Sequence, residues 1–136
     1  MVAYSFAPQF AEDVATLNKR QTVRRDRKRH ARPGEALQLY TAMRTKHCRK
    51  LLQIDPICVD VRPIEIEVGT YNQHLIVGIE ICGVALDADE IEAFAIADGF
   101  GGGLADGFAR RRMGEFWLKH HPWNRFLGVV IRWEPR

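Results

Sequence analysis

The chain has 136 residues, of which 46% are hydrophobic and 27% charged, the size and composition of one ordinary folded domain. No window of about 18 apolar residues is present, so the sequence predicts no membrane span, and the N-terminal segment lacks the charged start and apolar run of a signal peptide. Ser5 is the only serine and no GxxxxGK(S/T) or GxGxxG motif is present, which argues against a serine triad and a serine-containing phosphate loop. We therefore expect one cytoplasmic domain over residues 1–136.

The first elements along the chain are a strand and a helix. Val2–Phe6 is typical of a strand, and Pro8 suits the first turn of a helix. One apolar stripe at i, i+4 and i+7 marks the buried face of that helix: Phe10, Val14 and Leu17. Asn18 is predicted to end the helix in a left-handed conformation, because asparagine tolerates positive φ.

The next segment combines a charged loop with strand patterns on either side. A strand is predicted to begin at residues 22–23, and the charged stretch 24–32 is predicted to be a surface loop. Pro33 and Gly34 form a turn signal, after which alternating residues predict a half-buried strand over 37–40.

The middle of the chain is rich in strand patterns. Apolar residues alternate on odd numbers from Ile57 to Val61 and on even numbers from Ile64 to Val68, so a bulge or bend is expected at residues 62–63. Residues 75–81 alternate in a further strand. Sharp bends between short strands favour a small closed barrel over an open sheet.

The C-terminal part predicts two helices and a last strand. Asp87 followed by Glu90 is a capping-box pattern, and it starts a helix that ends near Asp98. Five glycines make 99–107 a loop, a helix is predicted over 109–120, and an apolar strand over 126–133. The predicted fold class is therefore mixed α/β (α+β), a small β-barrel with three flanking helices.

Charge is segregated along the chain. Residues 19–50 hold twelve cations and two acids, a net charge of +10, whereas residues 51–109 hold one cation and eleven acids, a net charge of −10. A dense patch of one sign attracts the opposite sign, and phosphate backbones are the commonest polyanions. The pattern favours a nucleic-acid or nucleotide partner. Two alternatives remain open: the two segments pair with each other in a mixed surface, or they meet between subunits.

Cysteine and histidine spacing gives no sign of a metal site. Cys48, Cys58 and Cys82 form no CxxC pair, and their odd number predicts reduced thiols. Cys58 and Cys82 lie in apolar strand patterns and are predicted to be core residues. His47, His120 and His121 do not match zinc-ligand spacing, so we expect neither a metal nor another cofactor.

Several local motifs together resemble one family. The stretch 18–24, NKRQTVR, resembles the GxKxxTxR signature of ASCH domains, which belong to the PUA-like superfamily, with Asn18 in place of the glycine. PGEALQLY at 33–40 is similar to that family's strand after a Pro-Gly turn, and MRTK at 43–46 resembles its phage and prophage members. AIADGF at 95–100, Phe116-Trp117 and GVVIRW at 128–133 resemble the C-terminal half, so the resemblance covers nearly the whole chain.

The resemblance implies a PUA-like barrel with a basic cleft for RNA or a modified nucleoside. One bacterial branch resembles amidohydrolases of N4-acylated cytidine, which use a lysine, a threonine and a carboxylate at the positions of Lys19, Thr22 and Asp98. Other branches resemble RNA-cleaving or purely RNA-binding proteins. Many relatives have glutamate where this chain has Asp98, and a near-duplicate Asp-Gly-Phe begins at Asp106, so the choice of acid stays open, with Asp98 preferred.

The chemistry of these residue types is consistent with that role. A threonine hydroxyl needs a neighbouring base to act as a nucleophile, and nearby arginines favour a neutral Lys19 amine. Lys19 and Thr22 converge only if the chain turns, which Asn18 would allow. The ordinary alternatives are a solvated lysine after a helix, a threonine chosen for strand propensity and an aspartate in a turn.

The predicted nucleic-acid contacts are the cations around this signature and one aromatic ring. Arginine suits bidentate phosphate contacts, and a tyrosine can stack on a base. Those residues are Arg20, Arg24, Arg25, Lys28, Arg29, Tyr40, Arg44 and Lys46. Arg44 and Lys46 are expected to lie beside the 24–32 loop. Trp117 and Trp133 are predicted core residues, whereas Trp123 either caps the barrel or stacks on a base.

Overall fold

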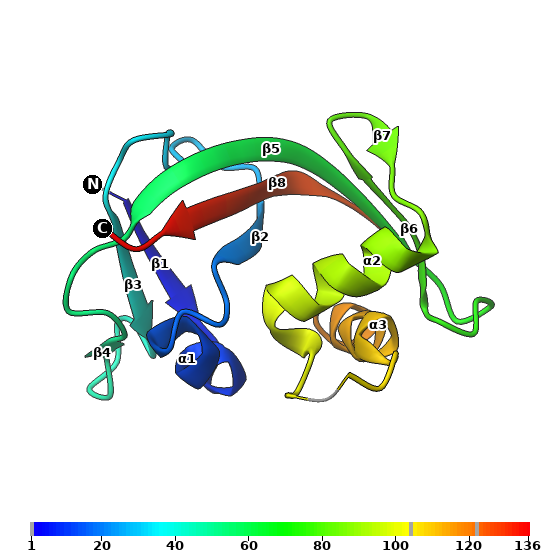
Figure 1. Cartoon of the computed structure of the whole chain (residues 1–136), viewed down its shortest axis with the longest axis horizontal. Helices are drawn as coiled ribbons and strands as arrows, with labels where there is room; N and C mark the ends of the chain where they lie inside the picture. Colours follow the sequence, from blue (N-terminus) through cyan, green and yellow to red (C-terminus); the bar gives the residue numbers. More distant parts are fainter. Residues whose placement is uncertain (1, 104, 122) are drawn as a thin grey trace. The chain divides into compact units, whose positions relative to one another are not determined.

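The computed structural model describes residues 2–103, 105–121 and 123–136 (Figure 1). These residues form α-helices, one π-helical turn and strands arranged in two sheets. The elements are β1 Val2–Phe6, α1 Pro8–Ala15, β2 Gln21–Arg25, β3 Leu37–Thr41, β4 Arg49–Lys50, β5 Ile57–Val68, β6 Ile76–Ile81, β7 Val84–Ala85, α2 Ala88–Ala95, the π-helical turn η1 Ile96–Phe100, α3 Ala109–His120 and β8 Arg125–Glu134.

The chain divides into two compact units. Unit 1 comprises Met1–Thr22, Arg27–Val61 and Ile131–Arg136, and unit 2 comprises Val23–Asp26 and Arg62–Val130. The boundaries between them fall within or beside β2, β5 and β8, so each of these strands contributes residues to both units. That the whole chain acts as one domain remains a prediction.

Unit 1 contains the three-stranded sheet, in the order β1-β3-β4. β1 runs parallel to β3, with Val2 opposite Leu37 and Phe6 opposite Thr41, and β3 runs antiparallel to β4 (Figure 1). Pro8 starts α1, as the sequence predicted, and the helix buries Phe10, Ala11 and Val14. The largest side chains in the core of this unit, all less than 2% exposed, are Tyr4, Leu37, Leu39 and Trp133.

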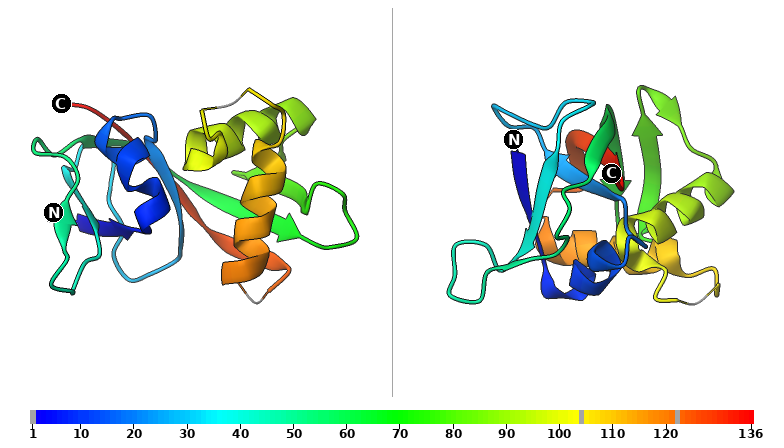
Figure 2. Two further views of the ribbon diagram at one scale, coloured as in Figure 1. Left: turned by 90° about the horizontal axis from the view of Figure 1, so that it is seen from below. Right: turned by 60° about the vertical axis from the view of Figure 1, so that its left-hand side comes forward.

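Unit 2 contains α2, η1, α3 and most of the five-stranded sheet (Figure 2). The predicted capping box starts α2: Asp87 Oδ1 accepts from the Glu90 amide at 2.8 Å, and Glu90 Oε1 accepts from the Asp87 amide at 2.9 Å. Trp117 of α3 is buried, and its ring meets the Phe126 ring at a centroid distance of 4.4 Å. Other fully buried side chains are Ile66, Ile76, Ile79, Met113 and Val130.

The mixed α+β class is confirmed, and the described residues do not show a closed barrel. The second sheet has the order β2-β8-β5-β6-β7, separate from the β1-β3-β4 sheet. Both sheets have end strands in these orders, β2 and β7 in one and β1 and β4 in the other. None of the described helices is both long and apolar enough to cross a membrane.

The expected change of phase in β5 is wrong. Residues 57–68 form one strand, and its buried positions are even-numbered throughout: Cys58, Ile64, Ile66 and Val68. The pairing with β6 covers residues 64–68 and has an irregularity between Glu67 and Val68, so a bulge or bend at residues 62–63 stays a prediction. Of the odd-numbered apolar residues in the first half, Ile57 and Val61 are half-buried and Val59 is 39% exposed. Apolar residues outside the buried face therefore led the alternation pattern to predict a change of face that the strand does not make.

Two further local predictions are corrected. Leu17, with φ 64°, holds the left-handed position after α1 that was expected for Asn18. Cys58 is buried as expected, and burial raises the pKa of its thiol to about 11, whereas Cys82 is exposed in a turn with φ 53°. Both errors concern residues at the end of an element, where neighbouring turn geometry decides the outcome.

Candidate functional site at the carboxyl ends of β1 and β3

Lys19 is a buried cation in unit 1. Its residue is 3% exposed, and Nζ lies 5.1 Å from the centre of the Phe10 ring and 5.9 Å from that of Phe6. The Lys19 amide donates to the Asp13 carbonyl at 2.9 Å, which closes the turn after α1 that Leu17 makes. Lysine is almost never fully buried without a specific use, so its burial marks the site.

The three proposed reactive residues, Lys19, Thr22 and Asp98, are all among the few buried polar or charged residues. The buried polar or charged residues of the described chain are Lys19, Gln21, Thr22, Thr41 and Asp98, and among them only Lys19 and Asp98 are ionisable. Thr22, in β2, is 4% exposed and Asp98, in η1, is 6% exposed. The solvated, ordinary role that was open for Lys19 is therefore excluded. Convergence of the three side chains stays a prediction.

The loop 42–48 lies at the same end of unit 1 as Phe6. Phe6 and Thr41 are register partners at the carboxyl ends of β1 and β3, and Thr41 Oγ1 donates to the Phe6 carbonyl at 2.9 Å. The Met43 amide donates to Ser5 Oγ at 3.2 Å and ties the loop to β1. Because Lys19 packs on the Phe6 ring, the buried ammonium and this loop share one end of the sheet.

This loop is both strained and cationic. Ala42 and Arg44 have φ values of 54° and 67°, a region that residues other than glycine seldom adopt. Backbone strain of this kind is concentrated at functional sites. Arg44, Lys46 and Arg49 are exposed, and none of the three has a described carboxylate within ion-pair distance. The loop therefore presents unneutralised positive charge next to a buried lysine.

The second basic loop, residues 26–36, is anchored on Tyr4. The Tyr4 hydroxyl contacts His30 Nδ1 at 2.9 Å and accepts from the Ala31 amide at 3.1 Å, and the Arg27 guanidinium lies 4.6 Å from the centre of the Tyr4 ring. Lys28 and Arg32 are exposed, and the described residues give them no ion pair. This loop precedes β3 whereas the 42–48 loop follows it, so the two lie at opposite ends of the strand (Figure 1). The expectation that they adjoin is wrong.

Arg29 neutralises Glu35 within the 26–36 loop. Its guanidinium forms a two-pronged ion pair with the Glu35 carboxylate, which also accepts from the Arg32 amide at 2.6 Å. The hydrogen bond from Arg29 is the main reason that the pKa of Glu35 falls to about 2, with the Arg32 amide adding to it against the effect of burial. Arg29, a predicted phosphate contact, is thus used to hold its own loop.

We expect the Glu35 carboxyl to titrate far below its ordinary pKa of 4.5, with a midpoint at about pH 2. Because the pKa is lowered by folding, the pair stabilises the loop above pH 4.5, and this contribution is lost as the pH falls through about 2. The side-chain carboxyl carbon of Glu35, followed by NMR across pH 1.5 to 6, measures the midpoint. In Arg29→Ala the midpoint should move up towards 4.5, and a wild-type midpoint near 4.5 would contradict the pair.

The remaining predicted contacts have mixed outcomes. Arg20 forms an ion pair with Glu134 at 2.6 Å, and Arg24 is half-buried in β2. Arg25 is exposed, with its guanidinium 5.5 Å from the centre of the Phe126 ring. Tyr40 is half-buried on β3 opposite Lys50, which pairs with Asp55 at 2.9 Å.

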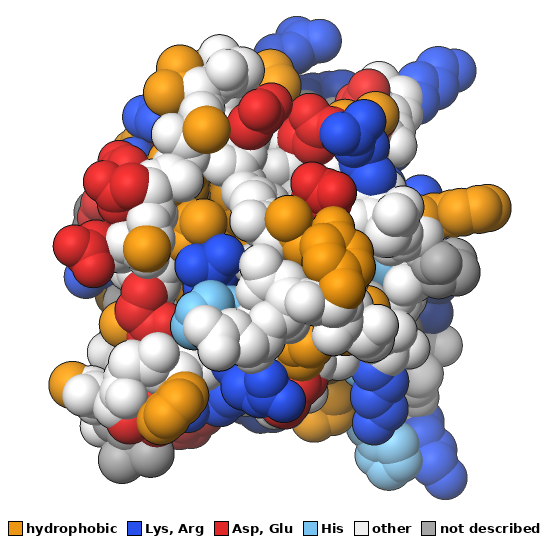
Figure 3. Space-filling model, turned by 90° about the vertical axis from the view of Figure 1, so that its right-hand side faces the viewer, with side chains coloured by type: hydrophobic (Ala, Val, Ile, Leu, Met, Phe, Trp, Pro, Cys, Tyr) orange, Lys and Arg blue, Asp and Glu red, His pale blue; other side chains and the backbone are white. Residues whose placement is uncertain are grey.

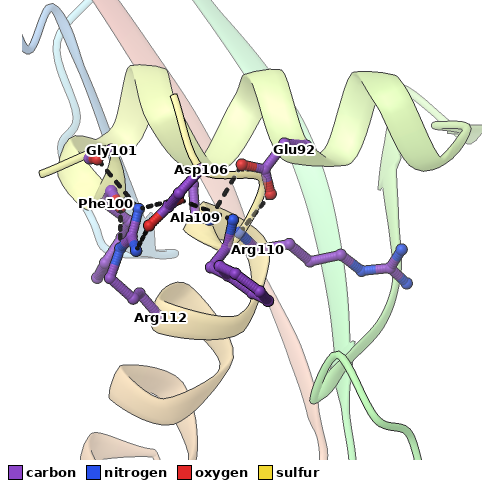
Figure 4. Close-up of polar contacts among 8 residues, drawn as sticks. Glu92, Phe100, Gly101, Asp106, Ala109, Arg110 and Arg112 are labelled. Atoms are coloured by element: carbon purple, nitrogen blue, oxygen red, sulfur yellow. Dashed lines mark hydrogen bonds and ion pairs between the residues drawn. The ribbon is translucent and has the colours of Figure 1, made fainter. Parts of the chain in front are cut away.

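The structure distinguishes the two Asp-Gly-Phe copies of unit 2. Asp106 is exposed, and Arg112 donates to its two carboxylate oxygens at 2.9 and 3.1 Å (Figure 4). The Arg112 contact, followed by the Phe108 amide, lowers the pKa of Asp106 to about 2. A carboxyl ionised at neutral pH is a poor general acid, which favours Asp98 over Asp106 for that role. Asp98 is the buried copy, and Gly99 after it takes φ 101°.

Two arginines and a glutamate that the sequence did not single out hold the segment around Asp98. Arg112 also donates to the carbonyls of Phe100 at 2.7 Å and Gly101 at 3.0 Å, at the end of η1 (Figure 4). Glu92 of α2 accepts from the Ala109 and Arg110 amides at 3.0 and 2.8 Å, which caps α3, and Arg110 donates to the Ile76 carbonyl. These contacts join residues distant in sequence, so no local motif indicates them.

The acidic middle of the chain has a surface of its own. A cavity of about 240 Å³ in unit 2 is lined by three glutamates, by Arg125 and by apolar residues: Glu65, Glu67, Glu80, Ile79, Leu86 and Ile91. Glu65 lies directly opposite Glu80 across β5 and β6, and Arg125 pairs with Glu65 at 2.8 Å. Figure 3 shows acidic side chains gathered in the upper and left parts of the face in view.

The described residues contain no group of three or more His, Cys, Asp or Glu side chains placed to hold a metal ion. The chemistry available at the site is thus that of a buried lysine, a buried hydroxyl, a buried carboxylate and exposed cations. Comparison of the chain with protein-family models, with curated proteins and with solved structures found no match in any of the three.

Proposed function

We propose that this chain is a PUA-like protein of the ASCH type that binds RNA or a modified nucleoside at the carboxyl ends of β1 and β3. The observation that carries the proposal is the cationic 42–48 loop beside the buried Lys19. Arg44, Lys46 and the adjoining Arg49 are exposed without a carboxylate partner among the described residues. Unneutralised arginine and lysine side chains suit phosphate oxygens, and counterion release then supplies the affinity.

The turn before Lys19 supports the resemblance to ASCH domains. Counted back from Lys19, the GxKxxTxR pattern has its glycine at position 17, one residue before the Asn18 that was expected there. Leu17 at this position has φ 64°, the conformation for which a glycine is normally required. A glycine at this position of the signature would adopt such a conformation without strain, so the positive φ of Leu17 is consistent with the proposed resemblance. The closed PUA-like barrel is part of this proposal.

Binding of single-stranded RNA should depend steeply on salt. If four phosphates are contacted, log K should fall against log salt with a slope of about −3. Removing two of the contacts in Arg44→Ala/Lys46→Ala should reduce that slope by about 1.4. Fluorescence anisotropy of a labelled RNA 12-mer, titrated with protein at several salt concentrations, measures both values. A DNA 12-mer of the same sequence separates RNA from DNA.

The matched comparison is Lys28→Ala/Arg32→Ala, which also tests Lys28, a contact predicted from the sequence, against the location proposed at the carboxyl ends of β1 and β3. It removes the same two charges from exposed positions in the loop at the other end of β3. The slope of this variant should stay close to that of the wild type. Equal losses in both double variants would contradict the location of the site, and undetectable or salt-independent binding would contradict the nucleic-acid partner altogether.

Hydrolysis of an N4-acylated cytidine is a second candidate function, favoured by the burial of Lys19, Thr22 and Asp98. In this reaction Lys19 takes the proton of the Thr22 hydroxyl, whose oxygen attacks the acyl carbonyl. Asp98 protonates the leaving N4 amine, so cytidine departs, and water then hydrolyses the threonyl ester to release the carboxylic acid. Formation of cytidine from N4-acetylcytidine, measured by chromatography, tests it. No cytidine after prolonged incubation would remove this candidate, and shortened RNA in the binding samples would instead indicate an RNA-cleaving member.

A further inference from the structure

The connection between α3 and β8 presents an exposed aromatic side chain. Trp123 is 65% exposed, whereas Trp117 and Trp133 are 4% and 0% exposed. An indole combines a large apolar ring with a polar N–H, so one left this exposed is available to stack on a ligand. Trp123 is also the tryptophan for which the sequence left two roles open, and the site at β1 and β3 does not use it.

Fixed elements hold both sides of Trp123. The Asn124 carbonyl accepts from the Val68 amide at 2.7 Å, and Phe126 is buried at the start of β8. His121 stacks on the Trp117 ring at a centroid distance of 4.1 Å and meets the Phe126 ring at 5.2 Å. The indole therefore projects from an ordered support, which reduces the entropy lost when a ligand binds.

The groups around this aromatic residue are mainly cationic. Lys119 and His120 are exposed in the last turn of α3, and Arg25 lies over the Phe126 ring. Burial lowers the pKa of His121, and Arg25 and His120 lower it further, which shows the positive potential of the cluster. Arg125 pairs with Glu65, and Glu115, one turn before Lys119, pairs with Arg111 at 3.4 Å.

We infer that Trp123 and the surrounding cations Arg25 and Lys119 form a second contact for single-stranded RNA, in which the indole stacks on an unpaired base and the cations face the phosphates. Base stacking on aromatic side chains combined with a cationic surface is how single strands are bound without sequence preference. An acidic peptide would satisfy the cations but offers no planar ring for the indole. The inference rests on the proposed function and extends it to unit 2.

Intrinsic fluorescence tests this inference directly, because Trp123 is the exposed emitter among the three tryptophans. Adding the RNA 12-mer should quench the exposed component of the emission, and Trp123→Phe should abolish the quenching with little loss of affinity, since phenylalanine also stacks. Trp123→Ala should weaken binding about tenfold, the effect of losing one stacked base. Leu127→Ala, which removes another apolar side chain that is 65% exposed, should bind as the wild type does.

The outcomes separate this inference from the function on which it rests. If anisotropy shows RNA binding but Trp123→Ala keeps full affinity and the emission does not change, the second contact is wrong and the proposed function stands. If wild-type protein binds no RNA by anisotropy, the proposed function and the second contact both fail. If poly-glutamate quenches Trp123 as strongly as RNA does, the surface responds to negative charge alone and the stacking role is wrong.

Discussion

Asp98→Asn should reduce hydrolysis of N4-acetylcytidine by a factor of about 10² to 10⁴, the usual contribution of a general acid, whereas Asp106→Asn should leave the rate unchanged. The two aspartates stand in the same Asp-Gly-Phe context eight residues apart, but only Asp98 is buried. The role of general acid proposed for Asp98 requires a protonated carboxyl that can donate to the leaving amine. Asp106 is held ionised by Arg112, with a pKa of about 2. Initial rates at saturating substrate measure the comparison.

Substitutions at Thr22 and Lys19 complete this test. Thr22→Ser keeps a nucleophilic hydroxyl and should retain activity, while Thr22→Val keeps the shape of the side chain and should lose it. Lys19→Met, which preserves the packing on Phe6 and Phe10 without the amine, should be as inactive as Asp98→Asn. Circular dichroism and thermal unfolding confirm that each variant is folded. Equal activity of Asp98→Asn and the wild type would show that Asp98 is not the acid.

The parts of the fold that the sequence predicted are those set by neighbouring residues. The capping box of Asp87 and Glu90 needs only four consecutive residues, and α2 begins there. Strand β1 was predicted with its observed bounds because its apolar positions alternate without ambiguity. The phase of β5 failed since apolar residues such as Val59 lie outside the buried face, and only the tertiary fold decides which face is buried.

The sequence predicted which residue types make up the candidate site, but not which of them are buried and which are exposed. The density of cations over residues 19–50 indicated surplus positive charge, and several of these cations are exposed without an ion pair among the described residues. It did not reveal that Lys19 is buried or that Arg29 forms an ion pair with Glu35. It also could not show that β3 separates the 26–36 loop from the 42–48 loop. Pairings such as Arg20 with Glu134 join positions 114 residues apart, beyond the reach of any local pattern.

Gly128→Ala should destabilise the protein by at least about 3 kcal/mol, at the upper end of what overpacking costs. A β-carbon at this position would lie 2.2 Å from the Arg24 carbonyl oxygen and 2.8 Å from a ring carbon of Phe126. The oxygen belongs to the backbone of β2, the neighbour of β8 in the sheet, so relief requires the two strands to separate. Urea unfolding followed by circular dichroism measures the loss.

Gly78→Ala is the matched control, because Gly78 also lies within a strand of the same sheet and a β-carbon there would meet no atom within 4 Å. Its free energy of unfolding should stay within about 0.5 kcal/mol of the wild type. Gly128 stands in the GVVIRW stretch, and Arg24 ends the NKRQTVR stretch. The GVVIRW stretch therefore needs a glycine at position 128, because the backbone of β2 passes too close for a side chain. Strand β2 is also the strand that carries Thr22. Equal stability of Gly128→Ala and Gly78→Ala would show that β2 can shift freely, and Thr22 would then have no fixed position from which to react.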